Sequence, residues 1–505
     1  MNERKNADIK NMHWSEIIAK KISGERKPPF VVAAGITPSG PVHPGTLCEF
    51  LYAHAINEQL KKYGKTEYIF VSDNFDDLDS VPEPLKEHAD IINQDMGMPL
   101  SLARDPKGCH KSFAEHFIAE TREIMKVFGV KPEFLRANEL YAKGEYDKYA
   151  KLLCERKDEV KQIVQESSLR KEMPEDWFPI IPLCEKCRNI SKNTITGYRD
   201  GTYKYKCSKC GHTGEDKIEG HHYKLLFRLD WPTRQKFLKV VVEGGSVDHH
   251  TPGGTISTLN AVHRKIYDEE PPYMYKFGLL KYKGKKYSKS KGIGHTVNEL
   301  LELAPTELIK YILFRPDLQE DKELVINKKT LFPLLDEFRR ISQMRDSDEG
   351  ASSRADHKKI IAFELCNVKK MWKADVADMV LYYNIYRDWK MVKKLTKDAE
   401  GVDLLEPYLK VWMDRGLVPD RYMFEIKTGE KPAGIVKKFI EKLDNKMHAE
   451  EIHNMVFEIA KENSVEPKEV FRQIYTWLIG KERGPRLGKL IYTVGVKKLK
   501  KHIGG

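Results

Sequence analysis

The sequence lacks several features that mark whole classes of protein. It has no run of about 18 apolar residues, which argues against a membrane-spanning helix, and no apolar stretch follows the charged residues at its start, MNERKNADIK. Cysteine is scarce, with eight residues in 505. We therefore expect a cytoplasmic protein without a membrane partner, whose cysteines do not build a disulfide framework. Because 40% of the residues are hydrophobic, the chain can bury a sizeable core.

The positive charge of the chain is concentrated in two places. The formal net charge is +12. Residues 481–505 contain eight Lys or Arg and one Glu, and residues 281–291 (KYKGKKYSKSK) contain six lysines interleaved with Gly and Ser. A polyphosphate substrate or a nucleic acid would account for both clusters. For the tail, a solvated face remains an alternative.

Apolar periodicity predicts a parallel β-sheet in the first part of the chain. Residues 28–36 (PPFVVAAGI) and 67–77 (EYIFVSDNFDD) are typical of buried strands, and residues 46–63 between them have helical spacing. This βαβ pattern is typical of a nucleotide-binding sheet with its site at the carboxyl ends of the strands. Further strands are expected at 239–244 and 273–280.

Other segments complete the expected organisation. Residues 112–175 are mostly helical in pattern, residues 181–216 are predicted to be a cysteine-bearing loop, and strand signals vanish after about residue 297. RDSDEGASSRAD, at 345–356, indicates an exposed loop. The expected fold class is α/β, with a Rossmann-type parallel sheet, a zinc-bearing insertion and an all-helical C-terminal region.

Five segments follow from this pattern. They are the first half of a Rossmann domain with a helical insertion (1–175), a zinc-binding insertion (176–222), the second half of the Rossmann domain (223–280), a connecting domain with the lysine-rich loop (281–330), and an all-helical region (331–505).

Two CxxC pairs provide the most specific spacing in the sequence. Cys184 and Cys187 are followed, after nineteen residues, by Cys207 and Cys210, and Gly211 follows the second pair. Four thiolates at this spacing close a tetrahedral zinc site. Because no coordination position stays open, we expect the zinc to be structural.

A second group of possible metal ligands lies nearer the N-terminus. Cys109 and His110 leave a Pro/Gly loop, His116 lies six residues further on in a predicted helix, and Asp95 could be a fourth ligand. On these residues alone, ordinary polar side chains remain an alternative.

Two loops indicate phosphate chemistry. HPGT, at 43–46, stands where the first strand meets a helix N-terminus, a position that favours a triphosphate, and a Cβ at Gly45 would obstruct a nucleotide. KYSKS, at 286–290, places Lys286 and Lys289 around hydroxyls, suited to stabilise charge on departing pyrophosphate. Since neither loop offers a covalent nucleophile, we expect the carboxylate of a substrate to attack the α-phosphate of ATP, with Mg²⁺ accompanying the ATP.

The two loops, in this order and about 240 residues apart, resemble the HIGH and KMSKS signatures of class I aminoacyl-tRNA synthetases. Thr46 replaces the second His, and Tyr287, a residue expected to pack, replaces Met. The stretches AAGITPSGPVHPGT, SDNFDDLDSVP, GCHKSFAEHF and GKERGPRLG resemble the archaeal-type class I lysyl-tRNA synthetases. The positions that match the two signatures are Gly45, Lys286, Ser288, Lys289 and Ser290.

The resemblance implies activation of lysine to lysyl-adenylate, transfer to the 3′ end of lysine tRNA, an anticodon-binding role for residues 331–505, and a second zinc at Asp95, Cys109, His110 and His116. It implies as catalytic residues His43, Gly45, Lys286, Ser288, Lys289 and Ser290. ATP-binding residues would be Pro38, Ser39, His43, Gly45, Thr46, Asp248, His249 and Lys289. Lysine-binding residues would be Gly35, Thr37, Trp231 in a polar DWP turn, His249, and Tyr273 or Tyr275.

A buried lysine ε-ammonium also needs a carboxylate. Asp73, Asp76, Asp230 and Asp248 all stand near predicted strand ends, and the sequence does not choose among them, although Asp73 is included with the substrate-binding candidates.

Three other functions fit parts of the pattern. They are a class I synthetase for another amino acid such as glutamate, a small-molecule nucleotidylyltransferase, and a non-catalytic RNA-binding zinc protein. Nucleotidylyltransferases are usually much shorter, which would leave the helical region without a task. A monomer is expected.

Overall fold

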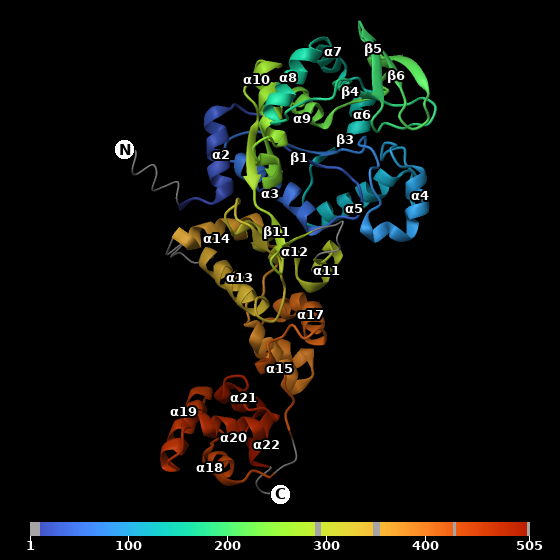
Figure 1. Cartoon of the computed structure of the whole chain (residues 1–505). Coiled ribbons are helices and arrows are strands. Elements are labelled where there is room, and N and C mark those ends of the chain that lie inside the picture. The colour runs from blue at the N-terminus through green and yellow to red at the C-terminus, as the bar shows by residue number, and fades with distance from the viewer. Residues whose placement is uncertain (1–10, 288–293, 347–353, 428–430, 502–505) are drawn as a thin grey trace. The chain divides into compact units, whose positions relative to one another are not determined.

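The computed structural model describes residues 11–287, 294–346, 354–427 and 431–501 (Figure 1). The chain divides into two compact units. The first unit comprises the described parts of Met1–Leu301, Ile309–Leu324 and Ser353–Cys366. The second unit comprises the described parts of Glu302–Leu308, Val325–Ser352 and Asn367–Gly505. No helix in the described ranges combines the length and the apolar character needed to cross a membrane.

A five-stranded parallel sheet forms the centre of the first unit. Its strand order is β10-β9-β1-β2-β3. The chain therefore moves from β1 in one direction to β2 and β3, and in the other direction to β9 and β10, so the carboxyl end of β1 is the switch point where α/β sheets bind ligands. The strands are β1 (Phe30–Ile36), β2 (Thr66–Ser72), β3 (Glu133–Arg136), β9 (Val242–Ser246) and β10 (Tyr273–Phe277).

Strand β1 is apolar along its whole length because both of its faces are covered. Val31 and Ala33 pack on one face with Ile69 and Val240. Helix α3 (Pro44–Leu60), which packs against β1, β2 and β9, is buried over most of its length and carries apolar residues on several faces. The other helices of this part are α2 (Trp14–Glu25), α4 (Ala89–Gln94), α5 (Phe113–Val127), α6 (Ala137–Ala142), α7 (Asp147–Glu155), α8 (Lys157–Ser167), α9 (Phe227–Phe237) and α10 (Thr255–Lys265).

The insertion between β3 and β9 is more ordered than the predicted loop. It contains a two-stranded ladder of β4 (Ile180–Pro182) and β8 (Tyr223–Leu225), and a three-stranded antiparallel sheet of β5 (Thr194–Arg199), β6 (Thr202–Lys206) and β7 (Thr213–Lys217). The expectation of a loop at 181–216 is therefore wrong.

Helices dominate the remainder, as the sequence predicts. Three short strands belong to this part: β11 (Leu280–Tyr282), β12 (Lys285–Lys286) and, between α12 and α13, β13 (Lys322–Glu323). The described helices are α11 (Val297–Leu303), α12 (Thr306–Phe314), α13 (Leu331–Arg345), α14 (Arg354–Leu365), α15 (Val376–Tyr386), α16 (Trp389–Thr396), α17 (Ala399–Asp414), α18 (Gly434–Lys442), α19 (Ala449–Glu462), α20 (Pro467–Ile479), α21 (Leu487–Val494) and α22 (Val496–Lys500). Most of the predicted loop at 345–356 lies outside the described residues.

Candidate active site

A cavity of about 320 Å³ opens at the carboxyl ends of β1, β9 and β10 and at the N-terminus of α3. This is the switch point of the sheet, where the strand order predicts a ligand. The cavity brings together the two loops singled out in the sequence, 240 residues apart. Of the predicted site residues, it is lined by Thr37, Ser39, His43, Gly45, Thr46 and Lys286.

His43 caps the N-terminus of α3. Its Nδ1 accepts the backbone N–H of Gly45 at 2.9 Å, so in the neutral imidazole the ring proton sits on Nε2. A Cβ at Gly45 would lie 2.4 Å from Cε1 of His43. Glycine is therefore required because the imidazole folds over the helix start, a different reason from the obstruction of a nucleotide that the sequence suggests.

The first strand's exit is tied to a buried charge network. Thr37 donates its hydroxyl to Asp76 at 2.6 Å, and Asp76 pairs with Lys224 of β8 at 2.8 Å. Gly35 does not line the cavity; a Cβ there would lie 2.7 Å from the backbone oxygen of Val71. Pro38 is buried next to the lining residues.

The four candidate carboxylates do not line the cavity. Asp73 forms an ion pair with the buried Arg234, and burial raises the pKa of Asp73 to about 7. Asp230 accepts hydrogen bonds from Tyr141 at 2.6 Å and Tyr146 at 2.9 Å. Asp76 is paired with Lys224, and Asp248 is exposed.

The lysine-rich loop begins within the described residues and then leaves them. Lys286 pairs with Asp248 at 2.5 Å, and both side chains are more than half exposed, so the pair is weak. Tyr287 is buried and donates its hydroxyl to the backbone oxygen of Leu324, which confirms that it packs. Ser288, Lys289 and Ser290 lie outside the described residues.

Glu49 is a cavity residue that sequence analysis missed. It stands on α3 and lines the cavity, and no hydrogen bond or ion pair to its carboxylate is recorded among the described residues. Burial, with a further contribution from Glu243, raises the pKa of Glu49 to about 8. In the sequence, the one indication that Glu49 reaches the site was its place in the predicted helix, six residues after His43.

The two candidate tyrosines of β10 differ in position. Tyr275 is buried, and burial together with the carboxylate of Glu49 raises its pKa. Tyr273 lies at the amino end of β10, where Lys21 approaches its ring at 4.6 Å from the centroid. Neither tyrosine lines the cavity, and Tyr275 is the one that lies close enough to Glu49 to feel its charge.

Trp231 and His249 contact each other but do not line the cavity. Their ring centroids are 5.4 Å apart in an edge-to-face arrangement. Trp231 is buried, and no hydrogen-bond partner is recorded for its Nε1 among the described residues. The predicted DWP turn is wrong, because Trp231 and Pro232 lie inside α9.

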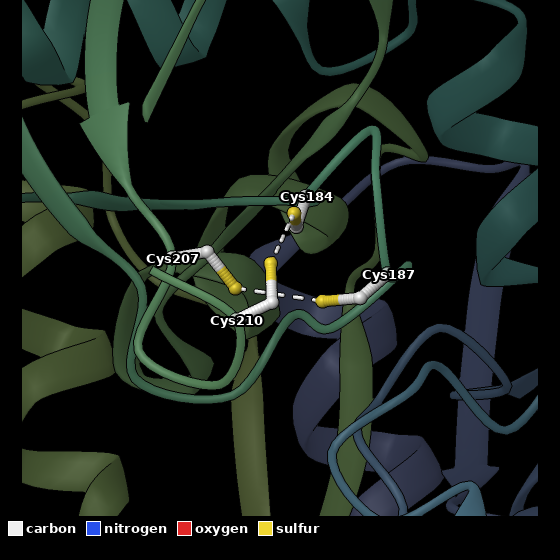
Figure 2. Close-up of side chains that lie close together, drawn as sticks. All are labelled: Cys184, Cys187, Cys207 and Cys210. Atoms are coloured by element: carbon white, nitrogen blue, oxygen red, sulfur yellow. Dashed lines mark hydrogen bonds between the residues drawn. The ribbon is translucent and has the colours of Figure 1, made fainter. Parts of the chain in front are cut away.

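The four cysteines of the CxxC pairs converge with their sulfur atoms facing inward (Figure 2). The Sγ atoms of Cys184 and Cys210 are 3.7 Å apart, and those of Cys187 and Cys207 are 3.5 Å apart. Tetrahedral zinc with Zn–S bonds of about 2.3 Å needs sulfurs about 3.8 Å apart. Gly211 has a φ of 68°, as the tight turn after the second pair requires. The donor set and geometry fit structural zinc.

The second cluster contains Asp105 in place of Asp95. Asp105, Cys109, His110 and His116 hold one ligand atom each within 4.8 Å of one another. The Sγ of Cys109 lies 3.1 Å from Nδ1 of His110 and 3.3 Å from Nδ1 of His116. This mixture of carboxylate, thiolate and imidazole also fits zinc.

The expectation of Asp95 as a ligand is wrong because its carboxylate is already occupied. Both of its oxygens accept hydrogen bonds from the Arg104 guanidinium at 2.8 to 3.1 Å. Asp95 and Asp105 both precede the Cys-His pair, and only the fold shows which of them reaches it.

Comparisons with known proteins found similar chains. A family model described as "tRNA synthetases class I (K)" matches residues 12–369. The lysine–tRNA ligase of Archaeoglobus fulgidus is 30% identical over 97% of this chain and 99% of the relative. The lysine–tRNA ligase of Pyrococcus horikoshii is 30% identical over 95% of this chain and 97% of the relative. Among solved structures, a glutamate–tRNA synthetase from Elizabethkingia anophelis covers 95% of this chain, and all of its own chain aligns, at 13% identity and a TM-score of 0.41.

The family match covers well over half of the 505 residues, and the relatives align along nearly their whole length. This chain is therefore a member of the class I (K) tRNA synthetase family.

Proposed function

We propose that this protein is a lysine–tRNA ligase. It uses ATP to convert lysine into lysyl-adenylate with release of pyrophosphate, and then transfers the lysyl group to the 3′ end of lysine tRNA. The aligned relatives are named lysine–tRNA ligases, which supports lysine as the amino acid. The cavity at the switch point of the sheet supports the nucleotide chemistry.

The observation that favours lysine over glutamate is the charge of the cavity wall. Glu49 is a carboxylate in the cavity with no recorded cationic partner, and Glu243 lies close enough to raise its pKa further. A lysine ε-ammonium would supply the missing positive charge, whereas a glutamate side chain would bring a third carboxylate. The buried hydroxyl of Tyr275 is the neighbouring group that could accept a hydrogen bond from the ammonium.

The other end of the amino acid would lie at the exit of β1. Because the Thr37 hydroxyl donates its proton to Asp76, its oxygen is left as an acceptor. That oxygen lines the cavity and suits the α-ammonium of an amino acid. Lys224 holds Asp76 from the opposite side, and so keeps Thr37 in one orientation.

The phosphates of ATP would lie against the start of α3. There the positive end of the α3 dipole favours an anion, and His43, which caps the helix, lines the cavity together with Gly45 and Thr46. The lysine carboxylate attacks the α-phosphate, the bond to the β-phosphate breaks, and the pyrophosphate leaves with the added negative charge. Lys286 can follow that charge because its pair with Asp248 is exposed and weak. Lys289 is proposed for the same task, with Ser288 and Ser290, and Mg²⁺ would enter with ATP.

The two metal clusters are proposed to be structural. Zinc held by Cys184, Cys187, Cys207 and Cys210 would join the ends of β4 and β6 in the insertion. Zinc held by Asp105, Cys109, His110 and His116 would anchor the start of α5. With four protein ligands each, neither ion keeps a position for a substrate.

The segmentation predicted above also stays a proposal, with the helical second unit binding the anticodon of tRNA. The many lysines and arginines near the C-terminus, eight among residues 481–501, support a polyanionic partner.

Calorimetric titration with stable adenylate analogues tests the choice of amino acid. We expect a lysyl-sulfamoyl adenosine to bind roughly 10²-fold more tightly than the glutamyl analogue, the scale of about 2.7 kcal/mol for an unpaired buried charge. Equal affinity, or tighter binding of the glutamyl analogue, would contradict the assignment.

A further inference from the structure

The last helices of the second unit carry a row of aromatic rings, in which Phe457 is exposed, His453 and Phe471 are half-buried and Tyr475 is buried. Helices α18 to α22 gather around one apolar core (Figure 1). On the outside of this group, Phe457 of α19 is 49% exposed. Its ring centroid lies 5.9 Å from that of Phe471 on α20 and 6.1 Å from that of His453 on its own helix. Phe471 also stacks on Tyr475 at 6.4 Å with an angle of 22° between the ring planes.

The motif GKERGPRLG, at 480–488, lies against this row. Tyr475 donates its hydroxyl to the backbone oxygen of Pro485. A Cβ at Gly484 would lie 2.9 Å from the Tyr475 ring, and a Cβ at Gly488 would lie 1.8 Å from the backbone oxygen of Ala449 on α19. The glycines of the motif therefore allow this segment to pass close to the rings, which brings Arg483 and Arg486 to their edge.

The charge beside the rings is mixed. Glu466, Glu469 and Glu482 line a hollow together with Phe471, Tyr475 and Arg483, and the two arginines of the motif supply accessible positive charge. Arg483 and Arg486 are exposed, and the single recorded ion pair of Arg486, to Glu450 at 3.6 Å, joins two side chains that are both more than 60% exposed. Burial and the charge of Arg486 lower the pKa of His453, so its ring is neutral at pH 7. Arg472 is different, because Glu469 holds its guanidinium.

We propose that His453, Phe457 and Phe471 form a stacking platform for unpaired bases of an RNA loop, with Arg483 and Arg486 contacting the flanking phosphates. Aromatic rings interleaved with arginine are the usual surface for single-stranded nucleic acid, since every base has a face that stacks and every nucleotide carries a phosphate. A double helix offers no free base faces, so the platform selects loops over duplexes. This inference rests on the RNA-binding function proposed above for the second unit, and it names the residues that perform it.

Binding of RNA by the full-length protein tests the platform. The probes are the anticodon stem–loop of lysine tRNA and a blunt RNA duplex of the same length, followed by fluorescence anisotropy. We expect the stem–loop to bind more tightly, and Phe457→Ala and Phe471→Ala each to weaken its binding by roughly 5- to 150-fold, the effect of removing one base–aromatic stack. Phe457→Trp should retain the affinity, and Phe457→Leu should not, although both keep an apolar side chain.

A matched control is Tyr63→Ala, which removes an aromatic ring that is 44% exposed in the first unit. It should leave the affinity for the stem–loop unchanged. Arg486→Ala should reduce the slope of log K against log salt by about 0.7, whereas the phenylalanine variants should leave that slope unchanged.

The outcomes separate this inference from the proposed function. If the wild-type protein charges lysine tRNA while Phe457→Ala and Phe471→Ala bind the stem–loop as wild type does, the platform is contradicted and the ligase function stands. If the protein activates no lysine but the two variants lose loop binding, the platform stands alone. If the variants change the sedimentation of the protein and not its RNA affinity, the rings are a protein–protein contact and the inference is wrong.

Discussion

At the scale of single residues, the wall of the cavity contains the carboxylate of Glu49, a residue that lies outside the sequence motifs. Glu49 lies on α3 between the helix start that suits phosphate and the buried Tyr275. We expect Glu49→Gln to raise the KM for lysine by at least about 30-fold, the lower end of the effect of truncating a buried charge pair, and to leave the KM for ATP within about twofold. Steady-state pyrophosphate exchange measures both constants.

Glu58→Gln is the control for this change. Glu58 stands on the same helix but pairs with Lys61 at 2.6 Å near the surface. If the two variants had the same KM for lysine, Glu49 would not contact the substrate.

The raised pKa of Glu49 makes lysine binding depend on pH. Below about pH 8 the carboxyl of the free protein holds a proton, and a bound ammonium favours the ionised form. Binding therefore releases a proton, and the affinity for lysine should increase with pH between 6 and 8, by at most about tenfold per unit. Calorimetry in buffers of different ionisation enthalpy counts the released proton. The same titration of Glu49→Gln should show no such release from this site.

Sequence analysis could single out candidate site residues that belong to a short motif with a fixed spacing. The four cysteines and the HPGT loop can be found in this way, because CxxC and a strand-to-helix junction are local patterns. Glu49 could not be found, since a glutamate within a helix has no distinguishing neighbour. The choice between Asp95 and Asp105 also needs the fold, because it depends on which carboxylate Arg104 occupies.

At the scale of elements, the insertion depends on its cysteines. Its sheet is small, and among the described strands β7 pairs with β6 alone. Cys207→Ser should remove one zinc per chain and abolish hydrogen-exchange protection in β6 and β7, while β1 and β2 stay protected. Elemental analysis and exchange mass spectrometry measure these two effects.

Cys109→Ser provides the comparison, since it removes a ligand of the other cluster. It should also remove one zinc but leave β6 and β7 protected. Wild-type protein with fewer than two zinc ions per chain, after reconstitution, would contradict the two-site account.

The elements that sequence analysis missed are short or disguised. β3 has four residues and lies between helices. In β6, Tyr203 and Tyr205 are buried and the lysines between and after them are exposed, a period of two that cysteines and turns on either side obscured. Pro232 suggested a turn, yet it lies inside α9. Long elements, such as β1 and α3, were predictable because β1 is apolar throughout and α3 carries apolar residues at helical spacing.

At the scale of the whole molecule, we propose that the basic C-terminus adds a long-range attraction for RNA. Lys497 and Lys498 of α22 and Lys501 are exposed. Changing all three to Gln should reduce the salt slope of tRNA binding by up to about 2 and leave lysine activation unchanged. An unaltered slope would mean that these lysines are only solvated and do not contact tRNA.

The division of the chain into units was only partly predictable. A helical region after about residue 297 follows from the amphipathic pattern, but segment 353–366, which contains α14, belongs to the first unit although it follows parts of the second. Such an exchange of segments could not be predicted from composition, because it depends on contacts between residues far apart in the sequence.

The central claim is that this chain activates lysine. ATP–pyrophosphate exchange with a panel of amino acids, with and without lysine tRNA, measures it most directly. We predict exchange that depends on lysine and on no other amino acid of the panel at comparable concentration. Exchange driven by glutamate and not by lysine, or no exchange with any amino acid when tRNA is present, would contradict it.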